Sequence, residues 1–112
     1  AMNRFAVKED CQDLFEQRWA ERSSKLPEQA GFLSFCLIRK KETNRCNVPF
    51  NYSSLTLWKS FDAWTTWRNG DGRYSHHASK TIKRTPVSAW LEHSASPIFW
   101  DGTKTIIAEC GI

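Results

Sequence analysis

The stretch that decides the fold is residues 52–67, which read YSSLTLWKSFDAWTTW. Its first part, residues 52–58, is rich in the aromatic, aliphatic and β-branched side chains that are typical of a strand. Ser60 then supplies a side-chain oxygen that suits the N-cap of a helix. Trp64 and Trp67 follow three residues apart, so they share one face of that helix. The sequence therefore predicts a strand that leads directly into a helix with two tryptophans on the same side.

The segments on either side of this stretch continue the alternation of strands and helices. Residues 8–26 begin with acidic side chains and then place apolar residues at helical spacing, until Pro27 and Gly31 end the helix. The other expected elements are a strand at 3–7, a strand at 32–38, a loop at 42–51, a short helix at 73–83, turns at 84–102 and a last strand at 103–109. The order of elements is therefore βαββαβ, with extra helical material before the final strand.

This order predicts an α+β fold of the ferredoxin-like type, formed as a single domain by residues 1–112. The helices of such a fold cover one face of the antiparallel sheet and leave the other face bare. Dimerisation through the bare face is one way to cover it. A chain of 112 residues builds only one core, so we also expect that a roomy cavity needs help from a partner subunit.

Composition and charge exclude several classes of protein. With 40% hydrophobic and 25% charged residues, the chain is a globular protein and not an intrinsically disordered one. No apolar run is long enough to span a membrane, and no signal peptide is visible. The four cysteines form no C-x-x-C pair, which favours reduced thiols. We expect an intracellular protein, in the cytoplasm or, if a targeting segment was removed ahead of Met2, in an organelle such as a plastid.

The net charge of +4 and the many aromatic residues also suit an RNA-recognition module, which has the same order of elements. Such a module carries a basic residue, a glycine and aromatic residues on its third strand. The nearest match here, AGFLSF at residues 30–35, lacks the leading basic residue and lies on the second strand. We therefore expect no nucleic-acid partner.

Two adjacent histidines, His76 and His77, follow Trp67 at a short distance. The histidines and cysteines of the chain are not spaced as a zinc site, which needs three or four ligands. A neutral imidazole beside a flat aromatic wall suits a haem iron better, although the spacing alone is a weak signal.

At these residues the sequence resembles the IsdG-type haem-degrading monooxygenases, within the antibiotic-biosynthesis monooxygenase superfamily. The matching pieces are NRFAV at 3–7, GFLSF at 31–35, LWKS at 57–60, AWTTW at 63–67 and HH at 76–77. They occur in the family's order and span most of the chain. The resemblance implies a dimeric α/β barrel in which each protomer has the ferredoxin-like fold.

The resemblance also implies a set of catalytic residues: Asn3, Trp67 and His77. His77 would be the proximal ligand of the haem iron, with His76 as the other candidate, because the distance from tryptophan to histidine varies by one in the family. Asn3 would hydrogen-bond to the iron-bound oxygen on the distal side. Trp67 would press on the porphyrin and ruffle it. The activity implied is oxidative opening of haem with O₂ and an external electron donor such as a reductase, with release of iron.

Arginines at the rim of a haem pocket would pair with the two propionates, and Arg22 and Arg4 are the candidates. We expect Trp19, Trp58 and Trp64 mainly in the core, with Trp67 as the wall against haem. Two alternatives remain at this point. One is a cofactor-independent monooxygenase of the same superfamily, which has the same fold and dimer but needs no iron ligand. The other is a carrier that binds haem and leaves it intact.

Overall fold

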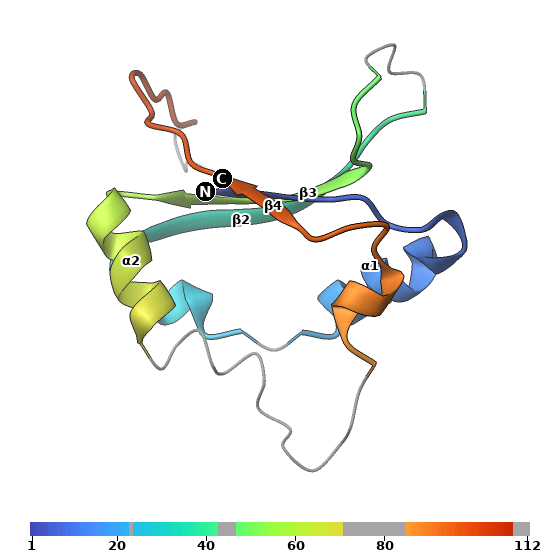
Figure 1. Ribbon diagram of the computed structural model, residues 1–112. Coiled ribbons are helices and arrows are strands. Elements are labelled where there is room, and N and C mark those ends of the chain that lie inside the picture. Colours follow the sequence, from blue (N-terminus) through green and yellow to red (C-terminus); the bar gives the residue numbers. More distant parts are fainter. Residues whose placement is uncertain (23, 43–46, 71–84, 109–112) are drawn as a thin grey trace.

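The computed structural model describes residues 1–22, 24–42, 47–70 and 85–108. Within these residues, four strands and two α-helices form the framework (Figure 1). In chain order they are β1 (Met2–Phe5), α1 (Gln12–Ala20), β2 (Phe32–Arg39), β3 (Tyr52–Trp58), α2 (Phe61–Asn69) and β4 (Ser96–Ile98), with short 3₁₀ helices η1 (Glu9–Cys11), η2 (Leu26–Glu28) and η4 (Val87–Trp90). The predicted order βαββαβ is confirmed. The expected helix at 73–83 lies outside the described residues.

The four strands form one antiparallel sheet in the order β2-β3-β1-β4. This is the ferredoxin-like topology, in which β1 lies between β3 and β4. The strand–helix unit predicted from residues 52–67 is confirmed, since β3 and α2 have the expected starting points. The Ser60 side chain caps α2 by accepting a hydrogen bond of 3.1 Å from the backbone N–H of Ala63.

The prediction of a last strand at residues 103–109 is wrong. The fourth strand is Ser96–Ile98, inside the segment expected to form turns, and residues 103–108 have no regular secondary structure. Pro97 makes this strand difficult to predict from the sequence, because proline lacks the backbone N–H that donates a hydrogen bond to a neighbouring strand. At the edge of the sheet, where β4 pairs with β1 alone, that missing donor faces away from the ladder.

The first helix is also shorter than predicted. The α-helical part ends at Ala20, and Leu26 belongs to the separate 3₁₀ helix η2, where Pro27 is at the second position. Leu26 is still buried, as its place in the apolar pattern implies. The periodicity therefore identified which residues turn inward, while the backbone between Ala20 and Leu26 leaves the helix.

The hydrophobic core lies between α1, η4 and one end of the sheet. At its centre Phe15 is fully buried, with its ring centroid 5.2 Å from that of Phe5 and 4.9 Å from that of Tyr52. Trp90 and Leu91 close the same cluster from the chain segment that precedes β4. Burying an aromatic side chain of this size stabilises the fold by about 1.5–3 kcal/mol, so this cluster anchors α1 on the sheet.

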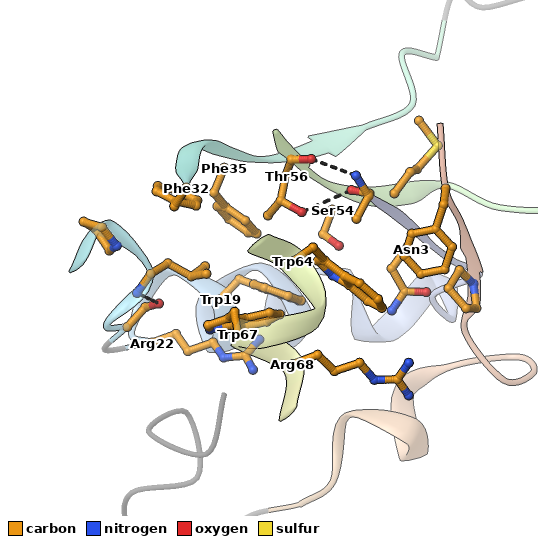
Figure 2. Close-up of a pocket in the computed structure, with 17 residues that line it drawn as sticks. Asn3, Trp19, Arg22, Phe32, Phe35, Ser54, Thr56, Trp64, Trp67 and Arg68 are labelled. Atoms are coloured by element: carbon orange, nitrogen blue, oxygen red, sulfur yellow. Dashed lines mark hydrogen bonds between the residues drawn. The ribbon is translucent and has the colours of Figure 1, made fainter. Parts of the chain in front are cut away.

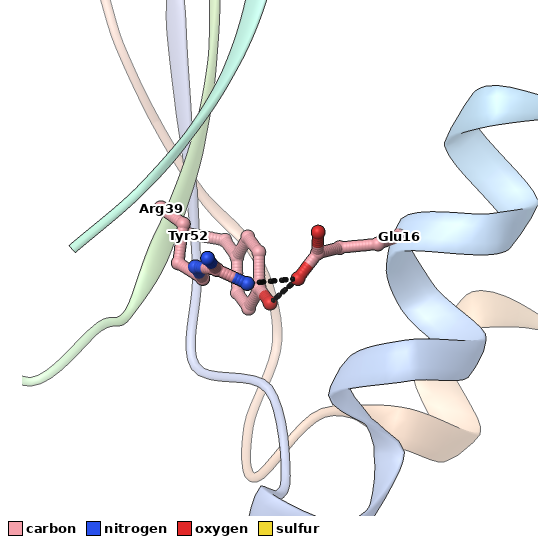
Figure 3. A network of polar contacts seen from close by, with 3 residues as sticks. All are labelled: Glu16, Arg39 and Tyr52. Atoms are coloured by element: carbon pink, nitrogen blue, oxygen red, sulfur yellow. Dashed lines mark hydrogen bonds and ion pairs between the residues drawn. The ribbon is translucent and has the colours of Figure 1, made fainter. Parts of the chain in front are cut away.

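A polar contact stands beside this core and joins α1 to two strands (Figure 3). The Tyr52 hydroxyl donates a short hydrogen bond to Glu16 Oε2, and the Arg39 guanidinium forms an ion pair of 2.9 Å with the same oxygen. The hydrogen bond from Tyr52 holds the pKa of Glu16 below its usual range. Burial, with the neighbouring Glu16 carboxylate, raises the pKa of Tyr52 to about 12. Both groups therefore keep their ordinary charge states at neutral pH.

The face of the sheet away from the helices is bare, in the sense that no helix of the described part of the chain covers it (Figure 1). Leu55 and Leu57 alternate with Ser54 and Thr56 along β3, so the two leucines point away from the helices. They are 39% and 43% exposed, and Ile38 of the neighbouring strand is 41% exposed. The expectation that the helices cover only one face of the sheet is therefore confirmed within the described part of the chain.

Candidate functional site

A cavity of about 810 Å³ opens on the helix side of the sheet, between α2 and the end of α1 (Figure 2). This volume lies within the range of about 300–1,000 Å³ that is usual for pockets that bind small molecules and cofactors. The described residues of one chain form it without a second subunit. The expectation that a chain this small needs a partner to build a roomy cavity is therefore wrong, because the core occupies only one end of the sheet.

The floor of the cavity consists of small polar side chains on the sheet. Asn3 of β1 pairs with Ser54 of β3 in the register, and Thr56 follows on the same face. Asn3 Oδ1 is buried and has no hydrogen-bond partner among the described residues. A buried amide oxygen without a partner is costly, and the two ends of an asparagine amide are interchangeable by rotation. Asn3 is therefore ready to hydrogen-bond with a ligand in the cavity.

Aromatic side chains form the walls. Trp19 stacks on Phe35 at a centroid distance of 5.5 Å and an interplanar angle of 20°. Trp64 meets Phe99 edge to face at 4.5 Å, and all four of these side chains line the cavity. Trp67 lies within the same wall, as Figure 2 shows. Such a lining suits a flat, largely apolar ligand.

Trp67 is held in place by a second tryptophan. Its ring centroid is 5.7 Å from that of Trp58, which in turn packs edge to face on Phe32 at 5.5 Å. Trp58 thus supports the cavity wall from the end of β3. Because Trp64 and Trp67 both line the cavity, the predicted shared face of α2 is the face turned toward the site.

The tryptophans divide differently from the expectation. The prediction that Trp58 and Trp64 belong to the core is wrong, since both are half-buried and outside the core cluster: Trp64 lines the cavity, and Trp58 packs on Trp67 behind the cavity wall. The prediction for Trp19 holds in part, because this residue packs against the core on one side and lines the cavity on the other. The buried tryptophan of the core is Trp90. Trp100 is 67% exposed.

A glycine allows α2 to approach the sheet closely. Gly31 has a positive φ of 82°, and a Cβ at this position would lie 2.6 Å from the Cβ of Ala63. Its carbonyl also accepts a hydrogen bond of 2.8 Å from the N–H of Lys59, just ahead of the helix. The Gly-Phe pair at residues 31–32 therefore positions α2, and with it Trp64 and Trp67, over the floor of the cavity.

Two arginines lie at the cavity, and one of them is not among the sequence-predicted residues. Arg22, a predicted propionate partner, lines the cavity with its guanidinium 4.5 Å from the ring centroid of Trp19. Burial lowers the pKa of Arg22, and the nearby Arg18 adds to this effect. Arg68 is the additional residue. The sequence could have indicated it, because it follows Trp64 by one helical turn and so lies beside it on α2.

Arg4, the other predicted propionate partner, is not in the cavity. It alternates with Asn3 along β1 and so belongs to the opposite face of the sheet, where its guanidinium donates to Ser96 at 2.8 Å. Successive side chains of a strand point to opposite faces of the sheet, so Arg4 cannot share the face of its neighbour Asn3. The candidate iron ligands His76 and His77 lie outside the described residues.

The described residues contain no cluster of three His, Cys, Asp or Glu side chains that could hold a metal ion. His93 lies in this part of the chain; it is exposed and is not part of the cavity lining. Cys11 and Cys36 are free thiols, while Cys46 and Cys110 fall outside the described residues. No helix in the described part of the chain is long and apolar enough to cross a membrane.

The fold and the site place the chain in a class. Residues 1–79 match the family of antibiotic biosynthesis monooxygenases, and the match covers the sheet up to β3, α2 and the cavity residues from Asn3 to Arg68. The chain therefore belongs to the antibiotic biosynthesis monooxygenase family. No curated protein sequence matches the chain.

Solved structures with the same fold include a haem degrader. The chain is similar to MhuD of Mycobacterium tuberculosis, a heme degrader solved with two hemes in its active site, with a TM-score of 0.71, 23% identity and coverage of 94% of this chain and 95% of that one. An MhuD variant with two manganese protoporphyrin IX molecules per active site gives a TM-score of 0.67, 22% identity and coverage of 96% of both chains.

A third similar structure is from Bacillus cereus and is described as an antibiotic biosynthesis monooxygenase. It has a TM-score of 0.62 and 16% identity, with coverage of 96% of this chain and 94% of that one. At these identities the similarity concerns the fold, which is ferredoxin-like in the α+β class. The choice of substrate within the family has to come from the residues of this chain.

Proposed function

We propose that this protein is a haem-degrading monooxygenase. The observation that carries the proposal is the aromatic cavity of about 810 Å³, which brings Asn3 and Trp67 together on the helix side of a monooxygenase-family sheet. Haem is flat, largely apolar and dianionic. The cavity offers aromatic walls, an unpartnered buried amide oxygen and two arginines, so its residues fit haem as a substrate.

In this proposal each described residue has a separate task. Trp67, supported by Trp58, presses on one face of the porphyrin, and the bulky indole keeps the macrocycle from lying flat. Asn3 presents its amide to the distal side from the floor of the cavity. Arg22 pairs with a propionate. His77, or His76 in its place, holds the iron. Bound haem supplies the oxygen chemistry, and O₂ and electrons from an external reductase are consumed as the porphyrin opens and iron is released.

Titration with hemin tests the binding step. We expect a sharp Soret shift that saturates at one haem per protomer and is lost in His77→Ala, with His76→Ala as the test of the other ligand. His93→Ala is the matched control, because His93 is exposed and outside the cavity lining. The absence of any Soret shift in the wild-type protein would overturn the proposal and favour a cofactor-independent monooxygenase.

Turnover tests the chemical step. Hemin-loaded protein supplied with O₂ and with ascorbate or a reductase should lose its Soret band, and mass spectrometry should detect an opened tetrapyrrole. A chelator should trap the iron that is released. Hemin that stays bound and intact under these conditions would show that the protein is a haem carrier.

We further propose that two copies of this chain pair through the bare face of the sheet. Leu55, Leu57 and Ile38 would be covered there, while the cavity on the helix side stays accessible. Light scattering should give twice the protomer mass for the wild type, and Leu57→Glu should shift the protein to the monomer. The control is Leu14→Glu on α1, which is also exposed but lies on the helix side. A monomeric wild type would contradict the pairing.

A further inference from the structure

The arginines of the described chain fall into two groups. Three of them lie outside the cavity lining and have polar partners: Arg4 donates to Ser96, Arg18 donates to the carbonyl of Thr85, and Arg39 pairs with Glu16. The other two, Arg22 and Arg68, line the cavity, and their guanidinium groups have no hydrogen bond or ion pair with any described residue. Among the described arginines, the two whose guanidinium groups have no hydrogen-bond or ion-pair partner are thus the two that line the cavity.

Among the described residues, the cavity lining contains no carboxylate that could neutralise these arginines. Its described residues include no Asp or Glu, while the rest of the lining is mainly aromatic and small polar. Unpaired guanidinium groups beside an apolar cavity attract anions, and their planar donor array matches a carboxylate. The charge of the site therefore selects for a ligand with more than one anionic group.

Arg68 is exposed at the mouth of the cavity and is held there by Trp64. Its Cζ lies 5.5 Å from the ring centroid of Trp64, one helical turn earlier on α2. Arg22 is placed in the same way by Trp19, from the segment that follows α1. Both guanidinium groups lie on the side of the cavity away from the strands (Figure 2). Stacking on a tryptophan limits the conformational freedom of a long side chain, so less conformational entropy is lost when the side chain binds an anion.

We propose that Arg68 is a second carboxylate-binding residue of the site, which together with Arg22 makes the cavity selective for porphyrins that carry two free propionates. This inference rests on the proposed function and adds a selectivity to it. Arg68 acts on the edge of the ligand, at the mouth of the cavity, whereas Asn3 and Trp67 act on its faces. A ligand with esterified side chains keeps the same flat ring but offers no charge to Arg68.

The test compares hemin with hemin dimethyl ester, each titrated into the protein in the same cosolvent and followed by the Soret band. For the wild type we expect hemin to bind about tenfold or more tightly than the diester, since charge-assisted hydrogen bonds are lost. Arg68→Gln should weaken hemin binding by about 3- to 10-fold and leave diester binding unchanged. Arg68→Lys should retain part of the affinity for hemin.

Arg18→Gln is the matched control, because Arg18 also stacks on a tryptophan, at 4.7 Å from Trp90, but lies outside the cavity lining. It should leave the preference for hemin over the diester unchanged. If Arg68→Gln weakens both ligands equally, or neither, the role of Arg68 is overturned while the proposed function stands. If the wild-type protein binds neither porphyrin, the proposed function is overturned and this inference falls with it.

Discussion

On the helix side of the sheet, the hydrophobic core fills one half and the cavity occupies the other. We call them the closed half and the open half. They lie only two residues apart along the same two strands. In the closed half Phe5 pairs with Tyr52 in the register, and Phe15 of α1 fills the space above them. In the open half the next pair on the same face is Asn3 and Ser54, and the space above them is the cavity. The backbone continues unchanged from one half to the other.

The difference between the two halves shows that side-chain size decides which part of this small domain is closely packed. Aromatic side chains on the sheet meet aromatic side chains on α1 and exclude solvent, whereas the small polar side chains of Asn3 and Ser54 leave the space above them open as the cavity. One chain of 112 residues can therefore contain both a core and a roomy site. The closed half supplies the stability, and the open half is free to bind a ligand.

The largest expected effect comes from emptying the closed half. Phe15→Ala removes a fully buried ring that contacts Phe5, Tyr52 and Trp19. Large-to-small changes of this kind cost about 3–5 kcal/mol, a large part of the stability of a small domain. Urea unfolding followed by tryptophan fluorescence measures the loss. A loss below about 1 kcal/mol would show that the closed half is not the stabilising core.

The next effect comes from filling the open half. Ser54→Leu adds an apolar side chain to the cavity floor beside Asn3, where a strand tolerates it. The fold should stay as stable as the wild type, while hemin affinity drops by roughly 30-fold, or about 2 kcal/mol, because the ligand meets the added atoms. Hemin titration and urea unfolding of the same preparation separate the two results.

The control for this change is Ser34→Leu, which adds the same side chain to an exposed position of β2 outside the cavity lining. It should bind hemin as tightly as the wild type. If both variants weaken hemin binding equally, the cavity on the helix side is not where haem binds. If Ser54→Leu leaves the affinity unchanged, the floor residues do not contact the ligand.

Much of the division into a closed and an open half could be predicted from the sequence, because the periodicity of the sequence determines which side chains share a face. The alternation along residues 3–7 and 52–58 already groups Asn3 with Phe5 and Ser54 with Tyr52. The helical spacing likewise groups Trp64 with Trp67. What the pattern could not supply is the register between strands, which brings Asn3 beside Ser54, and hence the place where the core ends.

Other features were missed for identifiable physical reasons. Trp64 is a large apolar residue of the kind expected in a core. It lines a cavity instead because the side chains opposite it on the sheet are small. The edge strand β4 contains Pro97, which a sequence reading assigns to a turn. From the sequence Arg68 resembles an ordinary surface arginine, and only the structure shows that it lines the cavity and that its guanidinium has no polar partner among the described residues. These properties depend on tertiary neighbours.

The smallest expected effect concerns the polar contact at the border of the closed half. Tyr52→Phe keeps the ring against Phe15 and removes the hydroxyl that donates to Glu16, so the free energy of unfolding should fall by about 1 kcal/mol at neutral pH. Hemin affinity should not change, because neither Tyr52 nor Glu16 lines the cavity. A matching loss of hemin binding would mean that the two halves are coupled.

The pH dependence of this stability difference identifies its cause. The pKa of Tyr52 is raised from 10.0 to about 12 in the folded protein, so its contribution is present below pH 10 and is lost as the pH rises through 12. The pKa of Glu16 is lowered below 4.5, chiefly by the hydrogen bond from Tyr52, so that contribution is present above pH 4.5 and is lost as the pH falls through the folded-state pKa. Unfolding at about pH 4, 7 and 11 should therefore show the largest difference between wild type and Tyr52→Phe at neutral pH. A difference that does not change with pH would assign the loss to packing of the ring, because only the hydrogen bond between Tyr52 and Glu16 depends on both charge states.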